Sequence, residues 1–190
     1  MKVFLYDLET TGLDPKLNAT HQLSGKIIID GNEVEKFDFH IQPFNGAAIS
    51  PEALEVSGVT VDQIINYPAE RDVFYDSLLP LLSKYVNRYD KNDKFYQLGY
   101  NVQHFDSQFL RAMFDRQGIR FFGSYFWSNC LDAMLLATPA LIDKRPAMPN
   151  FKQSTVAEYL GIKIDESRLH NANYDIELAQ AIYDKVCGKW

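Results

Sequence analysis

The sequence predicts an α/β fold in which a mixed β-sheet is flanked by helices, within a single domain of residues 1–190. The chain begins with three extended segments, and the second and third flank Asp30-Gly31-Asn32, a turn that favours a β-hairpin. Farther along, short apolar strands alternate with segments of helical periodicity. Antiparallel strands followed by strand–helix alternation favour a mixed sheet, and 190 residues are enough to bury one ample core.

The first strand is expected at Lys2–Asp7, and the hairpin at Gln22–Asp30 and Glu33–Gln42. The Pro51–Ser57 segment predicts a short helix, because proline is favoured in the first turn and Ser50 can cap it. Apolar residues from 74 to 85 recur at helical spacing and indicate a further helix, which Pro80 is expected to kink.

The second part of the chain is expected to alternate a strand at Lys94–Leu98, a helix from Asp106, and a strand at Trp127–Leu131. A helical pattern follows at Ala133–Ala137, and Asp132 before it is interpreted as a cap or first-turn charge. The last helix has a buried stripe that begins at Ile176.

The first strand delivers two carboxylates, Asp7 and Glu9, one residue apart. Residues i and i+2 of a strand lie on the same face, so both carboxylates should point the same way. Two like charges that close are costly unless a cation sits between them, and hard oxygen ligands suit Mg²⁺ or Mn²⁺. Taken alone, the pair is equally compatible with a strand that ends in a polar turn.

Two further segments carry acidic residues near the start of a helix. Asp106 lies in the first turn of the helix after the fourth strand, and Asp175 near the start of the last helix, five residues after His170. Each has a structural interpretation, because an aspartate at a helix N-terminus is stabilised by the helix dipole and a lone histidine is often a surface residue.

Together, the order Asp7-x-Glu9, Asp106, and His170-x4-Asp175 resembles the DEDDh branch of the DnaQ-like 3′→5′ exonucleases. Asp7–Gly12 matches the first motif of that family almost letter for letter, and Ile49–Thr60 resembles the stretch after its third strand. Asn101 with Phe105-Asp106 matches the second motif, and His170, Ala172 and Asp175 match the third. The resemblance covers about residues 2–187. The sister branch carries a tyrosine where this chain has Asn171.

This resemblance implies a ribonuclease H-like fold and a site for two Mg²⁺ or Mn²⁺ ions held by Asp7, Glu9, Asp106 and Asp175. It implies His170 as the general base. It also implies that Thr10, Thr11, Leu13 and Asn101 contact the substrate, whereas Phe105 is expected to belong to the core.

The implied activity is hydrolysis at the 3′ end of a single-stranded nucleic acid, with release of nucleoside 5′-monophosphates and with DNA favoured over RNA. The alternative is a module that binds nucleic-acid ends or a proofreading subunit of a polymerase. A polymerase partner or a homodimer stays open.

Two features depart from the family pattern. Ser57 stands where many members have a histidine, and the segment 138–154 is rich in proline and basic residues. We expect Lys144, Arg145 and Lys152 to hold the upstream part of the strand.

The acidic composition agrees with a nuclease that binds only the end of a strand. The net charge of −6 argues against broad duplex binding, although two divalent ions would offset four acidic charges at the site. Cys130 and Cys187 lack metal-ligand spacing and are expected to be free thiols. No signal peptide or membrane span is evident, so a cytoplasmic location is expected.

Overall fold

The computed structural model describes residues 1–168 and 172–188 and has a five-stranded sheet at its centre, in the order β3-β2-β1-β4-β5. The strands are β1 (Lys2–Thr10), β2 (Thr20–Ile29), β3 (Asn32–His40), β4 (Phe95–Gly99) and β5 (Leu131–Asp132). The first three are antiparallel neighbours, whereas β4 runs parallel to both β1 and β5. The predicted mixed sheet is therefore confirmed.

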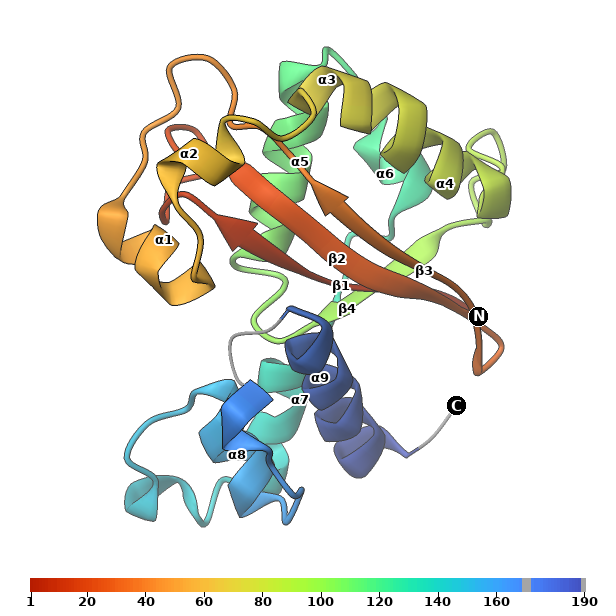
Figure 1. The fold of residues 1–190 in the computed structure, drawn as a ribbon. Helices are drawn as coiled ribbons and strands as arrows, with labels where there is room; N and C mark the ends of the chain where they lie inside the picture. The colour runs from red at the N-terminus through yellow and green to blue at the C-terminus, as the bar shows by residue number, and fades with distance from the viewer. Residues whose placement is uncertain (169–171, 189–190) are drawn as a thin grey trace.

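Helices cover both faces of this sheet (Figure 1). One layer contains α3 (Glu70–Val73), a π-helical turn (Phe74–Leu78), α4 (Leu79–Tyr85), α5 (Asp106–Arg116) and α6 (Phe122–Tyr125). The other contains α7 (Ala133–Ala140), α8 (Gln153–Tyr159) and α9 (Ala172–Cys187). The short helices α1 (Pro51–Ser57) and α2 (Val61–Ile64) follow β3, and 3₁₀ turns occur at Arg145–Ala147 and Glu166–Arg168. None of the described helices is long and apolar enough to cross a membrane.

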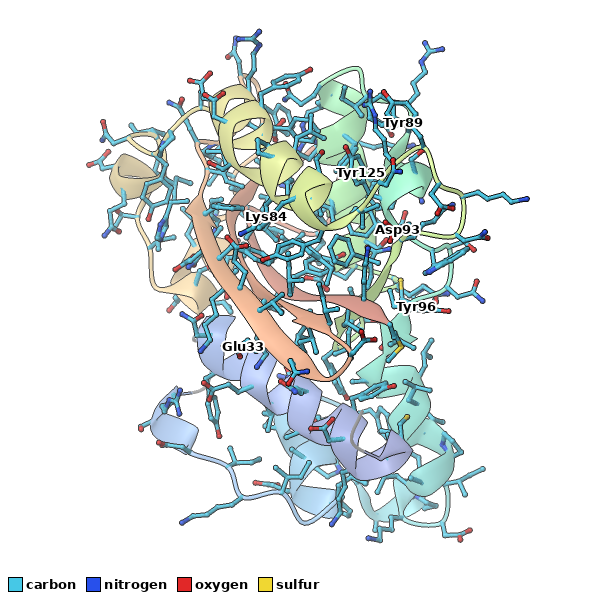
Figure 2. All side chains as sticks on the ribbon, turned by 90° about the vertical axis from the view of Figure 1, so that its right-hand side faces the viewer. Glu33, Lys84, Tyr89, Asp93, Tyr96 and Tyr125 are labelled. Atoms are coloured by element: carbon cyan, nitrogen blue, oxygen red, sulfur yellow. The ribbon has the colours of Figure 1, made fainter. Side chains whose placement is uncertain are left out.

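Strand alternation divides the core between the two layers. Phe4, Tyr6 and Leu8 of β1 face the layer of α3 to α6, where they pack in one large aromatic-rich cluster. Val3 and Leu5 face the other way and pack against α9. By the same alternation Asp7 and Glu9 continue the α9 face of β1, which puts both carboxylates on the side where Asp175 lies. Figure 2 draws side chains as sticks and labels Lys84 and Tyr125 in the first layer.

Two elements differ from the sequence expectation. The strand expected at Trp127–Leu131 is wrong in its bounds, because β5 comprises only Leu131–Asp132, and Phe126, just before the expected strand, makes an isolated bridge with Phe95. The helix over residues 74–85 is irregular before Pro80 rather than at it. The Leu79 N–H donates to the Phe74 carbonyl, so the wider π turn precedes the proline, which lacks an N–H of its own.

A buried ion pair joins α3 to the end of α5. The Glu70 side chain is 5 % exposed, and its carboxylate accepts hydrogen bonds from the Arg116 guanidinium at 2.7–3.2 Å and from Gln117 at 2.9 Å. The same guanidinium donates to the Pro15 carbonyl and lies 4.4 Å from the centre of the Phe44 ring. Arg116 therefore ties the helical layer to the loop that follows β1.

We expect Glu70→Ala to lower the free energy of unfolding by about 3–5 kcal/mol, because it leaves a mostly buried guanidinium without its counter-ion. Chemical denaturation measures the loss. The control is Lys84→Ala, which breaks an exposed pair with Glu35 and should have a much smaller effect. Equal midpoints for Glu70→Ala and the parent protein would contradict the role of this pair.

Candidate active site

The end of β1 is the part of the strand that holds two carboxylates. Asp7 and Glu9 are half-buried, and they flank Leu8, whose side chain is buried on the opposite face of the sheet. Pairing between β1 and β4 ends at Leu5 and Leu98, so the backbone of β1 beyond this point has no strand neighbour on that side. Other groups can therefore approach the end of β1.

Asp106 occupies this space. It is the first residue of α5, it is 3 % exposed, and its Oδ1 accepts a hydrogen bond of 3.1 Å from the Leu8 N–H. The start of α5 is thus bonded to β1 through the Leu8 N–H, which β4 is too short to reach. This bond holds the Asp106 carboxylate against the backbone of Leu8, the residue between Asp7 and Glu9.

Asp132 holds the loop that leads to Asp106. Its Oδ1 accepts from the backbone N–H of Asn101 and of Met134, and its Oδ2 accepts from that of Gln103, each at 3.0 Å. Asn101 has a left-handed backbone with φ of 59°. The structure confirms Asp132 as the cap of α7, and it adds a second role that the sequence did not reveal, because the same carboxylate also fixes the loop between β4 and α5.

Electrostatic interactions link the four carboxylates. Burial raises the pKa of Asp7 well above its ordinary value, and the charges of Asp106, Glu9 and Asp175 raise it further. Burial also raises the pKa of Glu9 to about 7; a hydrogen bond from Ser57 lowers it and the charge of Asp175 raises it. The pKa of Asp106 is raised to about 7, again chiefly by burial, although backbone N–H donors oppose the shift.

Asp175 lies in the first turn of α9, which packs on β1, and its backbone carbonyl accepts a hydrogen bond from Gln153 of α8. The structure thus brings Asp7, Glu9, Asp106 and Asp175 within electrostatic reach of one another. His170 lies outside the described residues, so its expected role as a base stays a prediction.

The loop after β1 contains the residues expected to contact a substrate. Leu13 is 83 % exposed, as a residue that stacks on a base must be. Thr10 is mostly buried and donates to the Gly12 carbonyl. Asn101 is half-buried, and its backbone N–H is held by Asp132.

Thr11 is engaged within the protein, and its expected contact with the substrate stays a prediction. Its side chain is buried, its hydroxyl donates to the Ala48 carbonyl and accepts from the Ala19 N–H, and its own N–H and carbonyl are bonded to Ala19, Ser50 and Asn18. Every polar group of Thr11 is used inside the protein, so Thr11 shapes the loop. Gly12 is required there, because a Cβ would lie 2.4–2.7 Å from the Asn18 side chain.

The donor set fits a divalent cation in its chemistry. Carboxylate oxygens are hard ligands, and in residues 1–168 and 172–188 no Lys or Arg pairs with Asp7, Glu9 or Asp106. In the same residues, no three His, Cys, Asp or Glu side chains already form a compact metal cluster. In the described residues, Asp7, Glu9 and Asp106 therefore have no basic counter-ion, and the site is not a closed metal cage.

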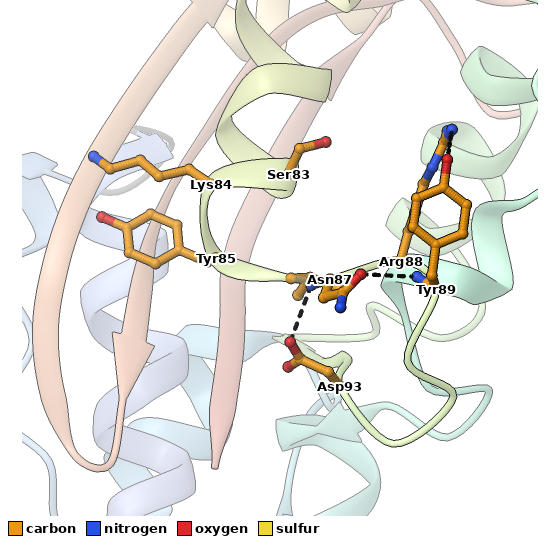
Figure 3. A pocket seen from close by; sticks show the side chains of 8 residues that line it. Ser83, Lys84, Tyr85, Asn87, Arg88, Tyr89 and Asp93 are labelled. Carbon is orange, nitrogen blue, oxygen red and sulfur yellow. Dashed lines mark hydrogen bonds between the residues drawn. The ribbon is translucent and has the colours of Figure 1, made fainter.

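A hollow of about 510 Å³ lies at a different place, between the end of α4 and the loop before β4 (Figure 3). Its charged groups are engaged locally, since the Asp93 carboxylate accepts from the Asn87 N–H and pairs with Lys2, and Arg88 donates to the Tyr89 hydroxyl. Lys2 begins β1, whereas Asp7 and Glu9 lie near its end. This hollow is thus not part of the carboxylate site.

The raised pKa values predict how metal-free stability depends on pH. A carboxyl group whose pKa is higher in the folded than in the unfolded protein binds more protons when folded, so stability falls as pH rises from about 4 towards 7. Asp106→Asn keeps an oxygen for the Leu8 N–H but removes this titration. In a chelator, we expect its melting temperature to fall less between pH 5 and pH 8 than that of the parent.

The control is Asp62→Asn on the exposed surface of α2, which should keep the slope of the parent protein. An unchanged slope in Asp106→Asn, together with lower stability at pH 8, would contradict the charge repulsion described above.

Comparisons with known proteins agree with this geometry. A family model described as Exonuclease (RNase_T) matches residues 4–183. Ribonuclease T of Blochmanniella pennsylvanica is 25 % identical over 97 % of this chain and 83 % of its own length. Ribonuclease T of Histophilus somni is 27 % identical over 94 % of this chain and 80 % of its own length. A PolC-type DNA polymerase III of Pediococcus pentosaceus is 24 % identical over 93 % of this chain, which corresponds to 11 % of the polymerase.

Among solved structures, Escherichia coli exonuclease I in complex with a dT13 oligonucleotide matches 97 % of this chain with a TM-score of 0.71 and 20 % identity. The chain spans 41 % of that exonuclease, so this likeness establishes the fold. The family match over almost the whole chain goes further. The chain belongs to the exonuclease family, among the DnaQ-like, DEDDh-type 3′→5′ exonucleases of the ribonuclease H-like superfamily.

Proposed function

We propose that this exonuclease removes nucleotides from the 3′ end of a single-stranded nucleic acid with the help of two Mg²⁺ or Mn²⁺ ions. The observation that carries the proposal is the meeting of four carboxylates at the end of β1, where burial and the charges of Asp106, Glu9 and Asp175 raise the pKa of Asp7. Family membership implies divalent metal ions. Their number and identity are part of the proposal.

Asp7, Glu9, Asp106 and Asp175 would hold the ions. Bound there, such ions lower the pKa of a water molecule and offset the charge that develops on the leaving 3′ oxygen. The protein positions these ligands on rigid elements, since Asp7 and Glu9 belong to a central strand and Asp106 is bonded to the backbone of that strand. His170 would accept the proton of the attacking water, because an imidazole with a pKa near ~6.5 is largely neutral at cellular pH.

Support for a single-stranded end comes from the loop after β1. Leu13 is exposed on a loop that Thr11 and Asn18 fix, so it can stack against an unpaired terminal base. A paired end must first be opened, at ~0.6–2.2 kcal/mol per base-pair step. Two exonuclease I structures with a similar fold are complexes with dT13 and dA16 oligonucleotides, and relatives in sequence are named ribonuclease T. The preference for DNA over RNA stays a prediction.

The basic residues of segment 138–154 are partly committed within the protein. The Lys144 ammonium donates to the Tyr159 carbonyl, and the Arg145 guanidinium donates to the Met148 carbonyl and lies over the Phe151 ring. Both side chains are nonetheless on exposed residues. We keep the proposal that they and Lys152 hold the upstream strand.

The first test uses end-labelled DNA and RNA oligonucleotides, single- and double-stranded. We expect a ladder that shortens from the 3′ side, nucleoside 5′-monophosphate products, and faster removal from unpaired than from matched ends. A chelator should stop the reaction, and Asp7→Asn should reduce the rate by at least two orders of magnitude. The Asp62→Asn variant is the matched control. Cleavage of circular single strands, or full activity without metal, would contradict the proposal.

The second test separates the base from the metal ligands. We expect His170→Ala to lose most of the rate and to keep Mn²⁺ binding, because the imidazole handles a proton and is not a ligand. Asp175→Asn should lose both. Calorimetric titration with Mn²⁺ and single-turnover rates measure the two properties, and an equal loss of affinity in both variants would make His170 a ligand.

A further inference from the structure

A mostly apolar pocket of about 350 Å³ lies between α7 and the segment that leads from α7 to α8. This volume is within the range of ~300–1,000 Å³ that is usual for small-molecule sites. The pocket is lined by Met134, Thr138, Ile142, Arg145 and Phe151. Among these five residues only Arg145 is charged, and the Thr138 hydroxyl donates to the Met134 carbonyl at 3.0 Å within α7. The pocket therefore offers apolar walls and one cation.

The Phe151 wall of the pocket is bonded to the carboxylate site. The Phe151 carbonyl accepts a hydrogen bond of 2.5 Å from the hydroxyl of Tyr100, the residue before Asn101. Two residues farther on, the Gln153 side chain donates to the Asp175 carbonyl at 2.7 Å. The backbone from Phe151 to Gln153 thus runs from the loop that carries Asn101 to the helix start that carries Asp175.

The Met134 wall is bonded to the same loop. The Met134 N–H donates to the Asp132 carboxylate, which also accepts from the Asn101 N–H, each at 3.0 Å. Both walls are therefore fixed to the turn that precedes Asp106. This places the pocket beside the carboxylates rather than on a remote face of the protein.

The surface around the pocket is positively charged in an acidic protein. Segment 138–154 has three basic residues, Lys144, Arg145 and Lys152, and one acidic residue, Asp143, whereas the whole chain has a net charge of −6. In residues 1–168 and 172–188 none of these three cations forms an ion pair. Lys144 and Arg145 each donate one hydrogen bond to a backbone carbonyl, which leaves further donors on both groups.

The chemistry of the walls matches that of a nucleotide. The Arg145 guanidinium lies 5.4 Å from the centre of the Phe151 ring, and Ile142 is 66 % exposed. A nucleobase is a planar ring that stacks on aromatic side chains or on arginine, and it is linked to a phosphate that a free cation can bind. Apolar walls with a cation and no acidic residue among them therefore complement a base and its phosphate.

We propose that this pocket binds an unpaired base of the substrate strand upstream of its 3′ end, while the neighbouring cations contact the adjoining phosphates. The inference rests on the proposed function of the carboxylate site and deepens it by naming the substrate class. The preferred substrate is a single strand long enough to reach the pocket, because a paired base is held within its duplex.

The test is a scan with dT oligonucleotides of ~12 nucleotides, each with one abasic site at a different position upstream of the terminal nucleotide. Release of the first 3′ nucleotide gives KM and kcat. We expect one position at which the missing base raises KM by ~5-fold or more, with a smaller effect on kcat. Ile142→Ala or Phe151→Leu should raise KM for the intact strand and remove the abasic penalty at that position, because base and wall belong to one interaction.

The same variants should raise KM much less with a dinucleotide, which is too short to reach the pocket. Arg145→Gln should weaken binding of the long strand and reduce its dependence on salt. The matched control is Leu135→Ala, since Leu135 is an apolar residue of α7 that is 43 % exposed and does not line the pocket. It should keep the parental KM and the abasic penalty. Melting temperatures check that each variant is folded.

The outcomes separate this inference from the proposed function. A parental KM in both Ile142→Ala and Phe151→Leu, a persisting abasic penalty, or an equal loss in Leu135→Ala overturns the base pocket. A dimer in sedimentation that Ile142→Asp dissociates without a change in KM overturns it in favour of a second copy of the chain. If the parent protein degrades the dinucleotide but no abasic position matters, the inference alone fails. If the parent degrades neither substrate, the proposed function fails as well.

Discussion

The gathering of four carboxylates at one end of the sheet is the constraint on which the rest of the structure depends. Burial and mutual repulsion raise the pKa of Glu9 and Asp106 to about 7, which means that their charged forms are unfavourable in the metal-free protein. Several contacts offset part of this cost. Asp106 and Asp175 lie in the first turns of α5 and α9, where the helix dipole favours negative charge, and the Leu8 N–H donates to Asp106. The remaining charge is what a divalent ion would neutralise.

Asp132 shows how the same residue type serves a different purpose a short distance away. Its two carboxylate oxygens accept three backbone N–H bonds, so they are committed to the loop before α5 and to the start of α7. This commitment has a consequence for the site. The left-handed backbone of Asn101 places the turn that leads to Asp106, and Asp132 holds that turn from the far side. The metal-ligand candidates are therefore supported by a carboxylate that is not itself a candidate.

Much of this arrangement could be predicted from local sequence rules. Alternation in β1 placed Asp7 and Glu9 on one face, and Pro51 after Ser50 indicated where α1 begins. Other features depend on pairing between distant segments, which no local pattern encodes. Three features depend on such pairing: β5 is short, every polar group of Thr11 is bonded, and a bulge makes His21 an extra residue in β2. Ser57 departs from the family pattern in the sequence, but only the structure shows its contact with the His21 ring. His170 lies outside the described residues, so its role still rests on the sequence.

The charge of the protein limits how such a site can hold a polyanion. With a net charge of −6, long-range attraction contributes little, and Lys144 and Arg145 already bond to carbonyls of their own region. In the proposed function, metal ions at the terminal phosphate and stacking on exposed side chains would add to the contacts of Lys144, Arg145 and Lys152 with the upstream strand. Leu13 is an exposed apolar residue on the loop that follows β1, and Thr11 with Asn18 fixes this loop. The distribution of charge thus favours recognition of a strand end over binding along a strand.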